Sequence, residues 1–299
     1  MISPPYLKKG DAIGIAATAR KITEEEIFGA ISAMNQAEFR TVLADNIFSV
    51  SDQFAGSDQQ RADGVNQLLR NPEVKAIWCA RGGYGSVRLI DKIDWDAFAA
   101  TPKWLCGFSD VTALHNHLQQ DLNIQSIHAE MMLGFNKNTA AAHQSLLNAL
   151  VGLENSYVFK GNLLNVNGRA QGEIVGGNLS VIYSMLGSRA QLNTAGKIIF
   201  LEDLDEYLYH IDRMMMALKR AGMLESITAL IVGGMSDMRD NAIPFGKTSE
   251  EIILDAVAEY DFPICFNFPA GHVKDNRALV FGATAEIEIG ERVTFSQTM

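Results

Sequence analysis

Short apolar runs alternate with amphipathic stretches through the first half of the 299-residue chain. The apolar runs are typical of buried β-strands, and they predict strands at 11–17, 41–44, 74–79, 104–108 and 124–128. Helices are expected between them, the first opened by a capping box of Thr23 and Glu26. Repeated alternation of strand and helix predicts a parallel sheet with helices on both faces.

The second half of the chain has a different pattern. Residues 151–169 lose the alternation and are rich in Asn and Gly, so we interpret them as a connection. Buried strands are expected at 198–201, 230–233 and 264–268, with helices over 208–218 and 249–260. Residues 285–295 alternate apolar and polar side chains, as in a half-exposed antiparallel hairpin.

Together these patterns predict an α/β protein with two domains. The N-terminal domain, 1–150, is expected to hold a doubly wound, mostly parallel sheet, and 151–169 to link it to the rest. The C-terminal domain, 170–299, is expected to be a mixed α/β unit with antiparallel hairpins. A chain of this length exceeds a comfortable single core, which favours the same division.

Composition narrows the class of protein. The formal net charge of −10 leaves no basic stripe for a polyanion, so nucleic acid is not expected as a partner. No stretch approaches the ~20 apolar residues of a membrane span, and the run at 13–19 makes a poor signal peptide. The three cysteines, Cys79, Cys106 and Cys265, sit in or beside apolar runs and are interpreted as small buried hydrophobic residues. A reduced, cytoplasmic protein is the simplest interpretation.

Ser109 is the first candidate for chemistry. It follows a predicted strand and precedes a predicted helix, so a sharp turn there would expose its hydroxyl above the sheet. That is the geometry of a nucleophile. On this stretch alone, a helix N-cap is the more ordinary role for serine, and Val111 replaces the second glycine of the G-x-S-x-G motif.

A glycine-rich segment, 81–86, follows the third predicted strand. Closely spaced glycines let a backbone approach a ligand and present free N–H groups, which could form half of an oxyanion hole. Neither G-x-x-x-x-G-K-[ST] nor G-x-G-x-x-G is satisfied, and a plain tight turn is the alternative.

Glu202 and His272 also follow predicted strands. A serine, an acid and a histidine at strand ends suggest a hydrolase triad, since loops at these ends bring distant residues together. Alone, Glu202 resembles a solvated acidic cap and His272 a surface histidine. A metal site recruiting these carboxylates with His128 or His210 lacks any recognised ligand spacing, and none is expected.

Several motifs taken together resemble the LD-carboxypeptidase family, which includes muramoyltetrapeptide carboxypeptidases and microcin-immunity proteins. The resemblance covers nearly the whole chain. The motifs are Leu7-Lys8-Lys9-Gly10-Asp11, Phe54-Ala55-Gly56-Ser57-Asp58, Arg81-Gly82-Gly83-Tyr84-Gly85, Gly107-Phe108-Ser109-Asp110, Gly176-Gly177-Asn178-Leu179-Ser180, Phe200-Leu201-Glu202-Asp203 and Gly271-His272.

The resemblance implies a serine peptidase that releases a C-terminal D-amino acid, typically D-alanine, from peptidoglycan tetrapeptides. It implies Ser109 as nucleophile, His272 as general base and then acid, and Glu202 as the group that orients the imidazole. The backbone N–H groups of Asp110 and of Gly83 or Gly82 would form the oxyanion hole. A homodimer is expected, and no cofactor or metal is implied.

The substrate's terminal carboxylate requires a cation near the site. Arg81 and Arg277 are the nearest to the proposed loops in sequence, and Tyr84 is a further candidate for substrate contact. Two departures from the family pattern affect the pocket. Ala16-Ala17-Thr18-Ala19 replaces a Pro-Ser turn, and His128-Ala129-Glu130-Met131 replaces His-Gly-Pro-Met.

Two alternatives stay open. One is an immunity-type hydrolase that acts on a peptidyl-nucleotide antibiotic with the same triad. It would need an aromatic residue to stack on the base, and no insertion after Gly187 supplies one. The other is a non-catalytic small-molecule binding protein in which Ser109 is only an N-cap.

Overall fold

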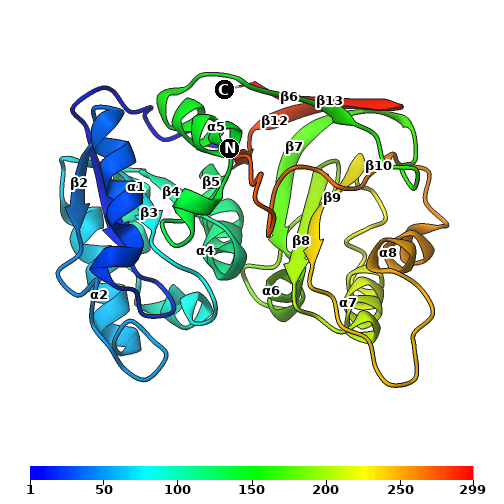
Figure 1. Ribbon diagram of the computed structural model, residues 1–299, viewed down its shortest axis with the longest axis horizontal. Helices are drawn as coiled ribbons and strands as arrows, with labels where there is room; N and C mark the ends of the chain where they lie inside the picture. The colour runs from blue at the N-terminus through cyan, green and yellow to red at the C-terminus, as the bar shows by residue number, and fades with distance from the viewer. Residues whose placement is uncertain (299) are drawn as a thin grey trace.

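Two β-sheets stand side by side in the computed structural model, which describes residues 1–298 (Figure 1). In spatial order the first sheet has β11 (Leu279–Phe281), β5 (Ser126–His128), β4 (Trp104–Gly107), β3 (Val74–Cys79), β1 (Ala12–Ala16) and β2 (Arg40–Leu43). Strands β1 to β5 are mutually parallel, and β11 runs antiparallel to β5. The predicted parallel sheet is therefore confirmed, with one antiparallel strand added from the far end of the chain.

The second sheet is mixed, as the hairpin pattern predicts. In order it has β10 (Ile264–Cys265), β9 (Ala229–Ser236), β8 (Ile198–Leu204), β7 (Gly168–Asn178), β12 (Thr284–Ile289), β13 (Arg292–Gln297) and β6 (Asn155–Lys160). The β7–β8, β8–β9 and β9–β10 pairs are parallel, whereas the β7–β12, β12–β13 and β13–β6 pairs are antiparallel. The predicted tail hairpin is β12–β13.

Helices complete the two halves. They are α1 (Glu24–Gln36), α2 (Asp58–Arg70), α3 (Trp95–Ala100), α4 (Thr112–His117), α5 (Ala140–Val151), α6 (Leu179–Ser184), α7 (Leu208–Arg220) and α8 (Ser249–Val257). Shorter helical turns are η1 (Ser86–Lys92), η2 (Ser109–Val111), η3 (Leu118–Leu122) and η4 (Phe135–Lys137). No helix among the described residues has the length and apolarity that a bilayer crossing requires.

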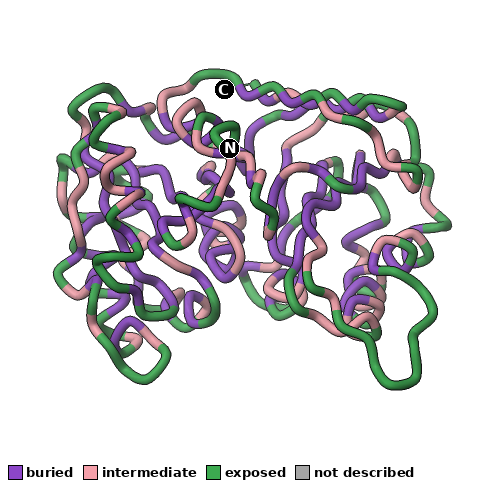
Figure 2. The backbone as a smooth tube through the Cα atoms, viewed as in Figure 1, coloured by how far each residue is buried: buried purple, intermediate pink, exposed green. Residues whose placement is uncertain are grey.

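Buried side chains cover both faces of the first sheet, which explains its uninterrupted apolar runs. Ile13 and Ile15 of β1 pack on one face with residues of α1 and α5, and Ala12 and Ala16 pack on the other with residues of α2 and α4. Figure 2 shows buried backbone running through both sheets and exposed backbone at the periphery. The three cysteines are free and buried, as predicted, and burial raises the pKa of the Cys79 and Cys265 thiols to about 12.

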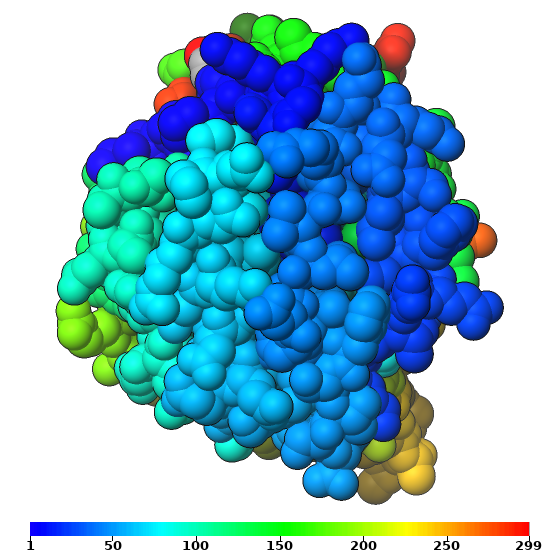
Figure 3. Space-filling view, turned by 90° about the vertical axis from the view of Figure 1, so that its left-hand side faces the viewer, coloured from blue at the N-terminus to red at the C-terminus, as the bar shows by residue number. Residues whose placement is uncertain are grey.

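The two halves are joined by more than one connection. The predicted connection 151–169 contains β6 and the start of β7, so part of it belongs to the second sheet. The chain also returns from the second half to add β11 to the first sheet. Figure 3 shows one side of the molecule formed mainly by the blue and cyan N-terminal residues. We keep the division into domains 1–150 and 170–299 as a proposal.

Several element boundaries differ from the sequence prediction, each by at most three residues. The strand expected at 264–268 ends at Cys265, because Asn267 takes a left-handed backbone conformation with φ 56° and Pro269 follows. The helix expected over 249–260 ends at Val257. The helix expected after the strand 104–108 begins with the tighter turn η2 at Ser109, before α4.

Candidate active site

Ser109 lies at a sharp turn between β4 and α4. Its backbone has φ 61°, a left-handed conformation that is strained for a residue with a side chain. It is the first residue of η2, and the cap positions of η2 and α4 belong to Phe108 and Val111. Neither helical turn receives a side-chain cap. The N-cap interpretation therefore does not describe Ser109, whose side chain lines a cavity instead.

The glycine-rich loop after β3 lies against this serine. A Cβ atom added to Gly82 would stand 3.4 Å from Ser109 Cβ and 3.5 Å from its Oγ. Within residues 1–298 the N–H groups of Gly82 and Gly83 donate no hydrogen bond. Unpaired N–H groups beside a nucleophile are what an oxyanion hole requires.

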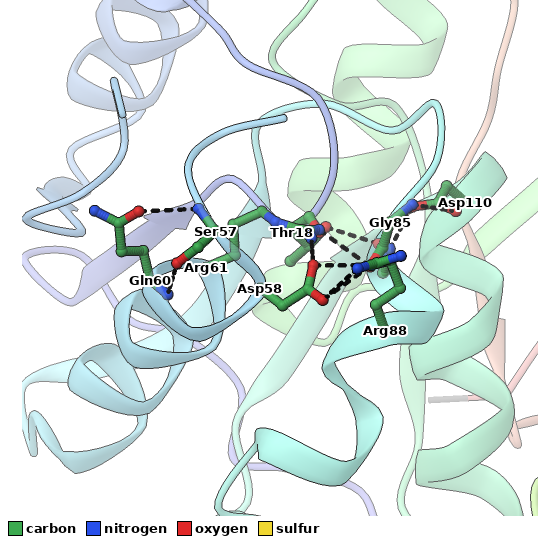
Figure 4. A network of polar contacts seen from close by, with 9 residues as sticks. Thr18, Ser57, Asp58, Gln60, Arg61, Gly85, Arg88 and Asp110 are labelled. Atoms are coloured by element: carbon green, nitrogen blue, oxygen red, sulfur yellow. Dashed lines mark hydrogen bonds and ion pairs between the residues drawn. The ribbon is translucent and has the colours of Figure 1, made fainter. Parts of the chain in front are cut away.

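Buried polar contacts hold the far end of this loop (Figure 4). The Asp110 carboxylate accepts hydrogen bonds from the N–H groups of Gly85 at 3.3 Å and Ser86 at 2.8 Å. The fully buried Arg61 guanidinium donates to the carbonyl oxygens of Thr18 at 2.6 Å and Gly85 at 3.1 Å. Arg61 also pairs with Asp58, so the helix α2 fixes the positions of two loops at once.

Glu202 and His272 form a close buried pair. His272 Nδ1 lies 2.5 Å from Glu202 Oε2, and the His272 backbone N–H donates to the same oxygen at 3.2 Å. The register of β8 against β9 shifts between Leu201 and Asp203, and Glu202 stands at this irregularity. Gly271 makes the approach possible, because a Cβ atom there would lie 2.6 Å from Glu202 Cβ.

In this pair, each side chain favours the charged form of the other. Burial favours the neutral carboxyl of Glu202, but the His272 imidazole outweighs it and lowers the pKa of Glu202 below its usual value. Burial likewise disfavours a charged His272, yet the Glu202 carboxylate raises the pKa of that imidazole above its usual value. With Nδ1 engaged by Glu202, the imidazole presents Nε2 for proton transfer.

A cavity of about 600 Å³ joins the two halves at this point. The first half contributes Arg20, Arg81, Gly82, Gly83, Tyr84, Val87, Phe108, Ser109, Asp110, Met131 and Leu133. The second half contributes Asn178, Ser180, Val181, Ser184, Asp203, Leu204, Asp205, Glu206 and His272. Among the described residues no hydrogen bond joins Ser109 to His272, although both line this cavity and the ring of His272 lies 4.8 Å from that of Phe108.

One wall of the cavity is acidic. Asp203 is buried, and its carboxylate accepts hydrogen bonds from the Asn178 side chain at 2.8 Å and the Ser180 N–H at 2.9 Å. Burial and the neighbouring Glu202 raise the pKa of Asp203 to about 7. Asp205 and Glu206 continue this wall towards solvent.

His128, at the end of β5, is packed between aromatic rings. The rings of Phe200 and Phe281 lie 5.0 and 5.3 Å from it, and within residues 1–298 neither of its ring nitrogens has a hydrogen-bond partner. Burial lowers the pKa of His128 to about 3, so it is neutral. His210 pairs with Glu206 instead, and no group of three His, Cys, Asp or Glu side chains in the described part of the chain is placed to hold a metal ion.

Comparisons with known proteins decide the family. Residues 13–129 match the family model of the LD-carboxypeptidase N-terminal domain, and residues 171–287 match that of the C-terminal domain. A probable murein peptide carboxypeptidase of Bacillus subtilis is 30% identical over 298 residues, which cover 97% of this chain and 92% of the relative. The chain belongs to the LD-carboxypeptidase family. It is accordingly a serine carboxypeptidase.

Other relatives of this LD-carboxypeptidase agree with that assignment. The murein tetrapeptide carboxypeptidase of Pseudomonas aeruginosa is 28% identical over 250 residues, covering 78% of this chain and 79% of the relative. The crystal structure of muramoyltetrapeptide carboxypeptidase from Oxalobacter formigenes superposes with a TM-score of 0.88 at 23% identity, covering 96% and 99%. The microcin C7 self-immunity protein in its apo state gives 0.89 at 20% identity, covering 100% and 99%. These two structures show the shared fold.

The structure separates the residues predicted to bind substrate. Arg81 and Tyr84 line the cavity of this LD-carboxypeptidase, whereas Arg277 is not among the lining residues. Arg277 donates to Asp275 at 3.0 Å and lies over the ring of Tyr157. Sequence reasoning missed Arg20, which follows the first strand in a segment that departs from the family pattern. Proximity in sequence to a loop is a poor guide here, because Arg20 reaches the site only through the fold.

Proposed function

We propose that this serine LD-carboxypeptidase releases a terminal D-alanine from murein tetrapeptides. One observation supports it most directly: Ser109, at a left-handed turn beside unpaired N–H groups, faces the same cavity as the buried Glu202–His272 pair. Relatives named as murein peptide and murein tetrapeptide carboxypeptidases support the choice of substrate.

The roles follow from the contacts. Serine is a weak nucleophile near neutral pH until a base takes its proton, and His272 Nε2 is the available base. Glu202 holds the imidazole through Nδ1 and stabilises the imidazolium that forms. The N–H groups of Gly82, Gly83 and Asp110 are the proposed oxyanion donors, each worth about 3–4 kcal/mol of barrier reduction when well placed.

Proton transfers balance in two steps. Ser109 Oγ attacks the carbonyl carbon on the amino side of the terminal residue, and its proton passes to His272. The imidazolium returns this proton to the leaving amine, which departs as a free D-amino acid and leaves an ester on Ser109. A water molecule then gives a proton to His272 and attacks the ester, and His272 passes that proton to Ser109 as the shortened peptide leaves.

Incubation with L-Ala-γ-D-Glu-meso-diaminopimelyl-D-Ala tests the proposal, with D-alanine release followed by mass spectrometry. Release is expected from the wild type and not from Ser109→Ala. The same peptide ending in L-Ala is the matched control and should not be cleaved. No release from the D-Ala peptide would overturn the proposed substrate, and peptidyl-nucleotides would be assayed next.

A fluorophosphonate probe separates catalysis from simple binding. It is expected to label the wild type and not Ser109→Ala, whereas a non-catalytic binding protein would show no difference. A homodimer and a cytoplasmic location complete the proposal. Light scattering after size-exclusion chromatography tests the first and cell fractionation the second.

A further inference from the structure

Charge is divided across the catalytic cavity. Two arginines of the first half, Arg20 and Arg81, line one side, where the Asp110 carboxylate is engaged by the N–H groups of Gly85 and Ser86. Three acidic residues, Asp203, Asp205 and Glu206, line the other side, although Asp205 pairs with Arg239 and Glu206 with His210. A substrate carboxylate is repelled by the acidic side and attracted by the basic side. The terminal carboxylate that defines a carboxypeptidase substrate therefore belongs on the arginine side.

The two arginines are not equivalent. Arg81 Nη1 donates to the Lys21 carbonyl oxygen at 2.9 Å, which commits part of its guanidinium. Arg20 is exposed, and among residues 1–298 its guanidinium makes no hydrogen bond or ion pair. An uncommitted guanidinium has its full fork of donors available for a carboxylate.

Arg20 also lies where the terminal carboxylate has to be. Gly82 flanks Ser109, and the next residue, Gly83, is covered by Arg20: a Cβ atom on Gly83 would stand 2.6 Å from Arg20 Cδ and 2.8 Å from its Nε. The Arg20 backbone nitrogen and the Gly82 carbonyl oxygen are 3.5 Å apart, so the loop after β1 lies beside the glycine-rich loop after β3. The terminal carboxylate follows the scissile bond by a single residue, about 3.8 Å along the chain. The Arg20 guanidinium lies against Gly83 of the glycine-rich loop and is therefore close enough to the scissile bond to bind this carboxylate.

We infer that Arg20 binds the substrate's C-terminal carboxylate and thereby restricts this enzyme to removal of a single terminal residue. This inference rests on the proposed function and names the cation that it requires. Arg20 takes the carboxylate-binding role that the sequence suggests for Arg277, which pairs with Asp275 and does not line the cavity. Arg81 contributes less to this binding, because its guanidinium is partly committed to Lys21.

A comparison of two peptides tests the inference. One is the tetrapeptide ending in D-Ala, and the other is the same peptide ending in D-alaninamide, which lacks the carboxylate charge. For Arg20→Gln we expect kcat/KM on the acid to fall about 50-fold, with the amide changed less than about 3-fold. The wild-type preference for the acid should thus collapse in this variant, and Arg20→Lys should restore part of it.

Controls separate the inference from the proposed function. Arg277→Gln should keep the wild-type preference, and unchanged fluorophosphonate labelling of Arg20→Gln would show that Ser109 is still correctly placed. An active Arg20→Gln that still prefers the acid as the wild type does, or a collapse seen in Arg81→Gln instead, would overturn the inference alone. A wild type that cleaves neither peptide would overturn the proposed function and the inference with it.

Discussion

Ser109 combines a side chain with a backbone conformation that suits glycine. Its φ of 61° is strained for any residue with a Cβ atom, by about 1–2 kcal/mol. Such strain persists at functional sites because the surrounding structure imposes it, here the end of β4 and the start of η2. The cost implies that stability and the proposed nucleophile compete at this position.

Two variants without the hydroxyl isolate this strain. Both Ser109→Gly and Ser109→Ala should be inactive, but only glycine relieves the left-handed backbone. We expect Ser109→Gly to be more stable than Ser109→Ala by about 1 kcal/mol in equilibrium urea unfolding. Equal stabilities would show that the turn is relaxed in solution.

The Glu202–His272 pair sets the acid limb of the pH profile. His272 accepts a proton only when neutral, and Glu202 raises its pKa above the usual 6.5, so kcat/KM should fall as the pH drops through that raised value. Glu202→Gln removes the charge that favours the imidazolium. We expect its acid limb to move to lower pH while kcat falls by about 10²–10⁴-fold. Rates measured from pH 4.5 to 9 check this, and an unmoved limb would contradict the pairing.

At the scale of elements, the loop after β10 positions the proposed base. Gly271 has φ 94° and lies directly against Glu202, with room for no Cβ atom. Gly271→Ala should therefore displace the pair and reduce kcat by about 100-fold or more.

Gly246→Ala is the matched control, since Gly246 has φ 86° in an exposed loop with no atom within 4 Å of its added Cβ position. Both variants bear a similar backbone penalty of about 1 kcal/mol, but only Gly271→Ala should lose activity. Steady-state kinetics with urea unfolding of each variant compares the two effects. Comparable activity losses would mean that backbone strain, not contact with Glu202, is responsible.

The strands of the first half could be predicted from sequence because both faces of the first sheet are buried, so each strand is a continuous run of apolar residues. Val74–Cys79 has the predicted bounds, and the Thr23–Glu26 capping box forms as predicted. Strand β7 was missed because it contains Gly176, where a Cβ atom would stand 1.9 Å from Phe200 O. Glycines needed for close approach to β8 remove the apolar pattern that marks a strand.

The candidate site was only partly predictable for a related reason. Ser109, Glu202 and His272 each stand in a local motif, and motifs are visible in a sequence. Arg20 stands in none. Its contact with Gly83 depends on how the loops after β1 and β3 are held together by Arg61 of α2. Side chains that reach a site through tertiary packing leave no local signal.

At the scale of the whole molecule, two buried histidines make stability depend on pH. Burial lowers the pKa of His115 to about 4 and that of His128 to about 3, so both stay neutral in the native protein near pH 5. The unfolded chain protonates them near pH 6.5. The contribution of these two histidines to the free energy of unfolding therefore falls as the pH drops below about 6.5, by at most about 1.4 kcal/mol per pH unit for each histidine.

His128→Phe should reduce this acid sensitivity, since phenylalanine fills a similar volume between the same rings and takes up no proton. Asp203, with its pKa raised to about 7, acts in the opposite direction, so the variant is compared with the wild type at each pH. Urea unfolding at pH 7.5, 6 and 5 should show a shallower decline for the variant. If the free energy of unfolding fell equally in the variant and the wild type, groups other than His128 would be responsible for the acid sensitivity.

Strand β11 has a consequence for the newly made chain. Synthesis proceeds from the N-terminus, so Ser109 leaves the ribosome long before His272, and the first sheet lacks its last strand until Leu279–Phe281 has been made. Until then β5 is an open sheet edge, and until His272 has been made the proposed nucleophile has no base. The topology thus delays hydrolytic competence until the second half has been made, and leaves that open edge to be protected in the meantime.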